Sequence, residues 1–230
     1  ISILAIHTGT KIGHQADTKQ LLPSLGSFKP SFLLAVPRVF EKVYNSAEQK
    51  AEAGGKGKIF RAAADTAVEY SKALDSGTVG LGLKIKFALF DRLVYSKLKA
   101  AMGGGVKYAV SGSAPLSTRL GHFYRSLGIK ILEGYGLTET TAPATENLVT
   151  RFKIGTTGPA LPGVSIRIAD DGEVQVKGVN VFAGYWKNEA ATKETFTDDG
   201  WFKTGDIGDL DDEGYLTITG RKKEIIITAG

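Results

Sequence analysis

Residues 128–140 read GIKILEGYGLTET, and this stretch decides how the rest of the chain is interpreted. Its first half, 128–132, is a short apolar run that predicts a buried strand. Its second half, 133–140, places two glycines, an aromatic ring, hydroxyls and carboxylates directly after that strand. Ligands of an open α/β sheet bind beyond the carboxyl ends of its strands, so this second half is a candidate ligand site.

The residue types of this candidate site suit a nucleotide and a hard cation. Glycine lets the backbone approach a ligand closely, and Tyr135 offers a flat face for stacking. Thr138 offers a hydroxyl to a phosphate oxygen, and Glu139 offers a carboxylate to Mg²⁺, which prefers oxygen ligands. The alternative is an ordinary strand–turn–helix, in which Thr138 or Thr140 only caps the helix.

Strand and helix signals alternate over the first 140 residues. The predicted buried strands are residues 1–6, 31–36, 106–110 and 128–132. Helices are predicted after Asp17, from about Arg38 and from near Ser117. Because helices separate these strands, the fold class is α/β, with a parallel sheet of βαβ units.

A helical insert is predicted at about 45–102, with breaks at 54–55 and near 77–82. One face of its last helix is apolar, because five residues recur three or four positions apart: Leu83, Phe87, Phe90, Val94 and Leu98. Basic residues lie mostly off that stripe. Packing of this face on the sheet is the simpler interpretation. Peripheral contact of the basic insert with a membrane is the alternative.

The pattern changes after about residue 150, where segments shorten and glycine becomes frequent. Strands are predicted at 164–169, 173–177, 215–219 and 224–228, joined by turns such as 171–172 and 213–214. We therefore expect an α/β lobe over 1–145 and a mostly β subdomain over 146–223 that ends at a hinge. Residues 224–230 are expected to begin a further, C-terminal domain.

Composition excludes several classes of protein. The chain is 42% hydrophobic and 23% charged, as in soluble globular proteins, and it has no cysteine, which excludes disulfides and thiolate chemistry. No apolar run approaches the roughly 20 residues of a membrane span, and no signal peptide is recognisable, so a cytoplasmic protein is expected. The net charge of +5 comes with no nucleic-acid-binding motif, so no nucleic-acid partner is expected.

Three further segments are candidates for ligand contacts. Residues 111–115 (SGSAP) form a turn after the third strand, where backbone groups could read a base. Residues 199–206 (DGWFKTGD) end in Asp206, and an acidic residue can accept both hydroxyls of a ribose. Residues 220–224 (GRKKE) form a charged connection between two apolar runs. Each segment taken alone also fits an ordinary turn.

Taken in order, these motifs resemble those of the AMP-forming acyl-CoA synthetase superfamily, which includes luciferases and peptide-synthetase adenylation domains. YGLTE at 135–139 matches its core motif, 111–115 its adenine-side turn, 204–206 its ribose motif and 220–224 its hinge motif. The long-chain fatty-acid–CoA ligase subgroup is indicated by VPRVFEKVY at 36–44 and by the helical insert. The match covers nearly the whole chain and implies part of the large domain of such an enzyme.

The resemblance implies a set of nucleotide-binding residues. They are Gly112, Ser113, Ala114, Glu133, Gly134, Tyr135, Gly136, Thr138, Asp206, Arg221 and Lys223. Tyr135 is expected to stack on adenine and Asp206 to take the ribose hydroxyls. Thr138 and Glu139 are the candidate catalytic residues, with Thr138 at the phosphate and Glu139 as the Mg²⁺ ligand. Lys223 is expected at the hinge.

The implied reaction uses ATP, Mg²⁺, a fatty acid and CoA. The fatty carboxylate attacks the α-phosphate to give acyl-AMP, and the CoA thiol then displaces AMP. The family's phosphate loop and adenylation lysine are expected outside residues 1–230, so the chain alone is expected to be inactive. The alternatives are a fatty-acyl-AMP ligase or other adenylating relative, and a nucleotide-binding module without catalysis. No oligomeric state is predicted.

Overall fold

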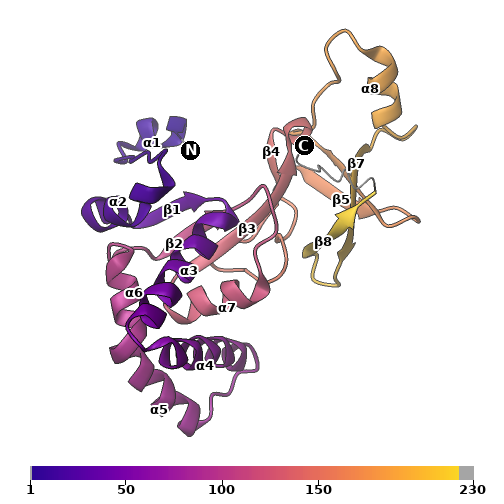
Figure 1. The fold of residues 1–230 in the computed structure, drawn as a ribbon. Coiled ribbons are helices and arrows are strands. Elements are labelled where there is room, and N and C mark those ends of the chain that lie inside the picture. Colours follow the sequence, from indigo (N-terminus) through magenta and orange to yellow (C-terminus); the bar gives the residue numbers. More distant parts are fainter. Residues whose placement is uncertain (1, 223–230) are drawn as a thin grey trace, which may run out of the picture. The chain divides into compact units, whose positions relative to one another are not determined.

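Two four-stranded sheets and a group of helices make up the computed structural model, which describes residues 2–222 (Figure 1). The strands are β1 Phe32–Ala35, β2 Tyr108–Ser111, β3 Lys130–Leu137, β4 Ala142–Glu146, β5 Val164–Ile168, β6 Glu173–Gly178, β7 Phe202–Leu210 and β8 Leu216–Arg221. The α-helices are α1 Ser2–Thr8, α2 Leu21–Phe28, α3 Pro37–Ala53, α4 Gly57–Asp75, α5 Leu81–Phe90, α6 Ser96–Ala101, α7 Thr118–Ser126 and α8 Glu189–Thr195. Three short turns of other helix types are η1 Thr18–Gln20, η2 Asp91–Tyr95 and η3 Thr138–Thr140.

The described residues divide into two compact units. The helical unit comprises residues up to Leu33, Arg38–Tyr108 and His122–Ile129. The sheet unit comprises Leu34–Pro37, Ala109–Gly121 and the described residues from Lys130 onward. The predicted lobe boundary at residue 145 stays a prediction, since these units interleave along the chain.

The first sheet has the strand order β1-β2-β3-β4 and contains parallel strands, as the α/β prediction required. Parallel neighbours need a crossover, and helices connect β1 to β2 and β2 to β3. β4 then pairs antiparallel with β3, with a bulge between Tyr135 and Gly136. A Cβ on Gly136 would lie 1.9 Å from the carbonyl oxygen of Ala142, so this pairing requires glycine.

The second sheet has the order β5-β6-β7-β8, and each neighbouring pair is antiparallel. The predicted β-rich subdomain is thereby confirmed for the described residues, with the short helix α8 in addition. Val176 and Phe202 of this sheet are buried in one core with Ala144 of β4. That shared core holds the hairpin β3–β4 against the second sheet within the sheet unit.

Helices occupy the region of the predicted insert, with breaks at the two predicted places; the insert's bounds at about 45–102 stay a prediction. α3 ends at Ala53 and α4 at Asp75, and α5 continues through η2 into α6. Phe87 of the apolar stripe stacks on Tyr70 of α4, with ring centroids 4.0 Å apart. The hydroxyl of the fully buried Tyr95 donates to the Ala63 carbonyl at 2.6 Å. The stripe therefore packs against α4.

Three strand predictions need correction. Residues 1–6 were expected to form a strand, but Ser2–Thr8 is helical, because a short apolar run does not distinguish the two. The strand at 31–36 exists as β1, yet Phe32 and Leu34 are 44% and 53% exposed rather than buried. β3 does not end at residue 132 but runs on to Leu137, because β4 pairs with its second half.

Some predictions fall outside the described part of the chain. Lys223, the strand at 224–228 and the start of a further domain at 224–230 lie outside the described residues. Among residues 2–222, no helix combines the length and the apolar character needed to cross a bilayer.

Candidate functional site

Tyr135, Asp206 and Arg221 form a hydrogen-bonded network in the sheet unit. The Tyr135 hydroxyl donates to Oδ2 of Asp206 at 2.7 Å, and Nε of Arg221 donates to Oδ1 at 2.8 Å. Asp206 is only 4% exposed, so these two donors compensate a buried carboxylate. The structure thus brings together the expected adenine platform and the expected ribose acceptor, which are 71 residues apart in sequence.

Chain pairing explains why this network forms. Tyr135 is held at a bulge of the β3–β4 hairpin, and Asp206 is paired with Arg221 across β7 and β8. Burial raises the pKa of the Tyr135 phenol above its ordinary value, and its hydrogen bond to Asp206 adds to this, so the phenol stays protonated. An ionised carboxylate has about four lone-pair sites. The network uses two of those on Asp206, which leaves acceptor capacity for sugar hydroxyls.

Glu173 and Lys222 support this network; neither is in the predicted set of site residues, although Lys222 lies in the charged segment 220–224. The buried carboxylate of Glu173 accepts the Gly205 N–H at 2.9 Å and lies 2.9 Å from Nζ of Lys222. The Lys222 N–H donates to the Gly205 carbonyl at 2.8 Å. These bonds fix the turn that precedes Asp206. For Glu173 the one available signal was a carboxylate directly after the Asp171-Gly172 turn, and such a residue fits the end of a hairpin equally well.

The turn at 111–115 lies beside β3, as predicted from its place after the preceding strand. A Cβ on Gly112 would lie 3.7 Å from the Gly134 carbonyl oxygen. Ser113 has a positive φ of 71°, and its side chain and that of Ala114 are exposed at the tip of the turn. The Leu116 N–H, just after this turn, donates to Oε2 of Glu133 at 3.1 Å.

Glu133 is a buried carboxyl between the turn and the strand. It is 9% exposed, and burial raises its pKa to about 7, with the Leu116 N–H acting in the opposite direction. Its carbonyl oxygen accepts the Asn147 N–H at 2.9 Å. The side chain therefore links the turn at 111–115 to β3, and it changes protonation near neutral pH.

Thr138 and Glu139 lie in the short turn η3 between β3 and β4. The turn is closed by the fully buried Thr140, whose Oγ1 accepts the Leu137 N–H at 2.9 Å. The strand–turn–helix alternative is wrong, because a strand follows and Thr138 caps no helix. Within residues 2–222 the exposed Thr138 hydroxyl has no hydrogen-bond partner, so it is available to a ligand.

Glu139 is tied to the segment around Gly184-Tyr185-Trp186. Its Oε1 accepts the Tyr185 hydroxyl at 2.9 Å, and its carbonyl accepts the Phe182 N–H at 2.8 Å. No group of three metal-ligating side chains occurs among the described residues. A lone carboxylate still fits Mg²⁺, because this ion is usually held by one or two carboxylates together with substrate phosphates and water.

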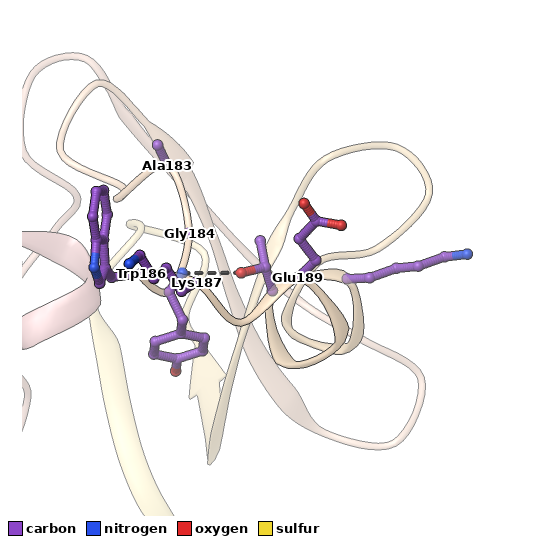
Figure 2. A pocket seen from close by; sticks show the side chains of 8 residues that line it. Ala183, Gly184, Trp186, Lys187 and Glu189 are labelled. Carbon is purple, nitrogen blue, oxygen red and sulfur yellow. Dashed lines mark hydrogen bonds between the residues drawn. The ribbon is translucent and has the colours of Figure 1, made fainter.

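An open pocket of about 420 Å³ adjoins Tyr185, between residues 183–187 and α8 (Figure 2). The Tyr185 N–H donates to Oγ1 of Thr192 at 2.9 Å, the bond drawn dashed in Figure 2. A Cβ on Gly184 would lie 2.6 Å from Cγ2 of Thr192, so the loop closes on α8 only with glycine there. The pocket thus lies next to the side chain that positions Glu139.

Comparison with known proteins assigns the chain to a family. The family described as "AMP-binding enzyme" matches residues 3–186. The chain is 59% identical over 230 residues to the long-chain-fatty-acid–CoA ligase FadD15 of Mycobacterium tuberculosis and covers 38% of it. It is 36% identical over 238 residues to long chain acyl-CoA synthetase 5 of Arabidopsis thaliana, with 96% of this chain and 35% of that protein covered.

Solved structures agree with the sequence matches. The ATP-bound MatB of Rhodopseudomonas palustris superposes with a TM-score of 0.61 at 28% identity, over 93% of this chain and 35% of that chain. The chain therefore spans about a third to two fifths of the length of these relatives. Since the family match extends over most of its residues, the chain belongs to the AMP-binding enzyme family.

Proposed function

We propose that this chain is part of a long-chain fatty-acid–CoA ligase that forms acyl-AMP from a fatty acid and ATP and then transfers the acyl group to CoA. The observation that carries the proposal is the Tyr135–Asp206–Arg221 network. It puts a flat ring and a carboxylate with spare acceptor sites next to each other, as recognition of an adenosine requires. Similarity to FadD15 supports the long-chain substrate class.

The proposed roles follow the chemistry of each group. Tyr135 stacks on adenine beside the backbone of the turn at 111–115, and Asp206 accepts the ribose hydroxyls while Arg221 holds its other oxygen in place. The exposed hydroxyl of Thr138 donates to the α-phosphate. Donors aimed at the phosphoryl oxygens offset the charge that develops there when the fatty carboxylate attacks.

Glu139 is the proposed Mg²⁺ ligand, held in place by Tyr185. Bound Mg²⁺ would neutralise phosphate charge and orient the pyrophosphate leaving group. The Tyr185 hydroxyl donates to one oxygen of Glu139, which leaves the other oxygen free to turn toward a ligand. No residue of the chain is proposed as a nucleophile, because the substrate carboxylate and the CoA thiol perform both attacks.

A fatty-acid-dependent exchange of radiolabelled pyrophosphate into ATP tests the first half-reaction in the intact protein that contains these residues. The proposal expects exchange with a long-chain carboxylate and none without it. A fatty-acyl-AMP ligase would show the same exchange but no release of AMP on adding CoA. A nucleotide-binding module without catalysis would show no exchange at all.

We also propose a cytoplasmic enzyme that contacts the membrane peripherally through α5 and η2. Four large apolar side chains are exposed there at a spacing of four residues: Leu81 at 74%, Ile85 at 63%, Leu89 at 58% and Leu93 at 45%. Lys84 and Lys86 are exposed on the same helix, which suits an anionic lipid surface. Sedimentation with anionic vesicles should weaken when Ile85 and Leu89 are replaced by serine.

A further inference from the structure

A half-open apolar groove lies in the helical unit, and it uses none of the residues of the candidate nucleotide site. Its volume is about 440 Å³, within the range of pockets that hold one small molecule. Buried Phe60 and Leu98 form its floor, and Ile59, Leu93 and Val94 form its apolar walls. Ile59 is 46% exposed and Leu93 45%, so apolar surface remains open to water at this groove.

Three lysines line the same groove: Lys50 from α3, Lys56 just before α4, and Lys97 from α6. All three are exposed. Within the part of the chain that the structure describes, none of them has a carboxylate within ion-pairing distance. An apolar hollow therefore carries three uncompensated positive charges at its edge.

The carboxylates nearest to these lysines along the chain are already paired. Glu52 lies 2.6 Å and Glu48 3.8 Å from Nη1 of Arg61. Asp91 lies 3.4 Å from Nζ of Lys99. The groove thus favours an anion supplied from outside the helical unit.

The wall formed by η2 is an irregular part of its helix. η2 is a π-helical turn between α5 and α6, and it supplies Leu93 and Val94 to the groove. Its last residue, Tyr95, is anchored in the core by its bond to the Ala63 carbonyl. Single π turns inside α-helices are frequent at functional sites.

We propose that this groove binds one long-chain carboxylate as a monomer, separately from the nucleotide site. The apolar chain lies on Ile59, Leu93 and Val94, and the carboxylate lies among the three lysines. A long-chain carboxylate combines one apolar chain with one negative end, which are the two properties that the groove complements. A hollow of one ligand's volume fits a single chain, whereas a bilayer surface needs a broad face.

Photolabelling of the intact protein with a diazirine-bearing hexadecanoic acid tests the proposal. Saturating hexadecyl-AMP, an unreactive mimic of acyl-AMP, is added to occupy the catalytic site so that this site contributes no label. Because labelling needs no turnover, its result does not depend on the proposed enzyme activity. Labelled peptides should fall within 47–60 and 93–101. Hexadecanoate should compete for labelling, and hexadecanol at equal concentration should not.

Charge-matched variants sharpen the test. The triple variant Lys50→Gln, Lys56→Gln and Lys97→Gln should weaken labelling affinity about tenfold, since each exposed ion pair contributes modestly. The matched control replaces Lys58, Lys84 and Lys86 by glutamine, which removes the same charge from lysines that do not line the groove, and should leave labelling unchanged. Ala51→Phe, which fills the groove and leaves the lysines in place, should abolish labelling in a variant whose melting curve shows it folded.

Several results would overturn the proposal. Labels absent from both segments would mean that no free chain enters, as when another part of the intact protein covers the groove. Equal competition by hexadecanol, or equal weakening by the control triple variant, would remove the role of the three lysines. Capture of the protein by phosphatidylglycerol vesicles through these lysines, without labelling by the monomeric acid, would assign the groove to a membrane surface.

Discussion

Replacing Asp206 by asparagine removes the charge at the centre of the candidate site with little change in shape. The side chain accepts from Tyr135 at 2.7 Å and from Arg221 at 2.8 Å and is almost fully buried. A hydrogen bond to a charged group contributes about 1.5–3 kcal/mol, and asparagine keeps one acceptor. We therefore expect Asp206→Asn to weaken ATP binding by about 1–3 kcal/mol, or about 5- to 150-fold.

The assay is calorimetric titration of the intact protein and the variant with ATP and with 2′,3′-dideoxy-ATP, which lacks both ribose hydroxyls. The unmodified protein should bind the dideoxy nucleotide more weakly than ATP. The variant should distinguish the two nucleotides much less, because the charged acceptor that separates them is replaced by one neutral amide oxygen. Comparing four affinities isolates the contact between Asp206 and the ribose.

A structural contribution of Asp206 is measured separately. Its replacement deprives the Tyr135 hydroxyl of an acceptor, whereas the Arg221 side chain is 62% exposed and stays hydrated. Tyr135→Phe serves as the matched control, since it breaks the same internal bond and keeps the carboxylate. If Asp206→Asn weakened ATP and dideoxy-ATP equally, or left ATP affinity unchanged, the assignment of Asp206 to the ribose would be refuted.

Four other perturbations test the remaining assignments. Glu139→Gln should lower turnover by orders of magnitude and raise the Mg²⁺ requirement, while the melting temperature barely moves. An unchanged dependence of the rate on Mg²⁺ with near-normal turnover would remove Glu139 from the site. Tyr185→Phe should shift the Mg²⁺ dependence in the same direction but less. Because burial raises the folded-state pKa of Glu133 from 4.5 to about 7, the contribution of this side chain to stability should be complete below pH 4.5 and should be lost as the pH rises to about 7, with a slope of at most about 1.4 kcal/mol per pH unit. Glu133→Gln should flatten this slope in urea unfolding series, and a persisting slope would assign it elsewhere. Residues 1–230 alone should give no measurable pyrophosphate exchange, because the phosphate loop and the adenylation lysine are expected outside them. Each lost electrostatic contact of this kind costs about 10²–10³ in rate.

Local periodicity predicted most of the fold. The breaks of the helical insert and strands β5, β6 and β8 of the second sheet followed from glycine pairs and alternation, which act over a few residues. Strand β7 was not predicted, because the glycine-containing segment at 199–206 fits an ordinary turn. β4 was not predicted, because it forms by pairing with the second half of β3. Gly134 and Gly136 in that half obscure the alternation that would indicate a strand. The helix at Ser2–Thr8 was mistaken for a strand for a related reason: a short apolar run fits both.

The candidate site was also predicted only in part from local sequence patterns. The turn at 111–115 was expected beside β3 because strand ends share one edge of a sheet. The proximity of Tyr135 and Asp206 came only from the family resemblance, since residues this far apart meet through sheet packing that no local pattern encodes. The ion pair between Glu173 and Lys222 was not predicted, because charged residues are mostly exposed and the sequence does not show that the Glu173 carboxylate is buried.

Product analysis of the intact protein tests the central proposal most directly. ATP, Mg²⁺ and hexadecanoate are supplied with and without CoA, and AMP, acyl-AMP and acyl-CoA are quantified after quenching. A long-chain fatty-acid–CoA ligase should release AMP in step with acyl-CoA and only when both hexadecanoate and CoA are present. Accumulation of acyl-AMP that CoA does not discharge, or formation of ADP in place of AMP, would contradict the proposal.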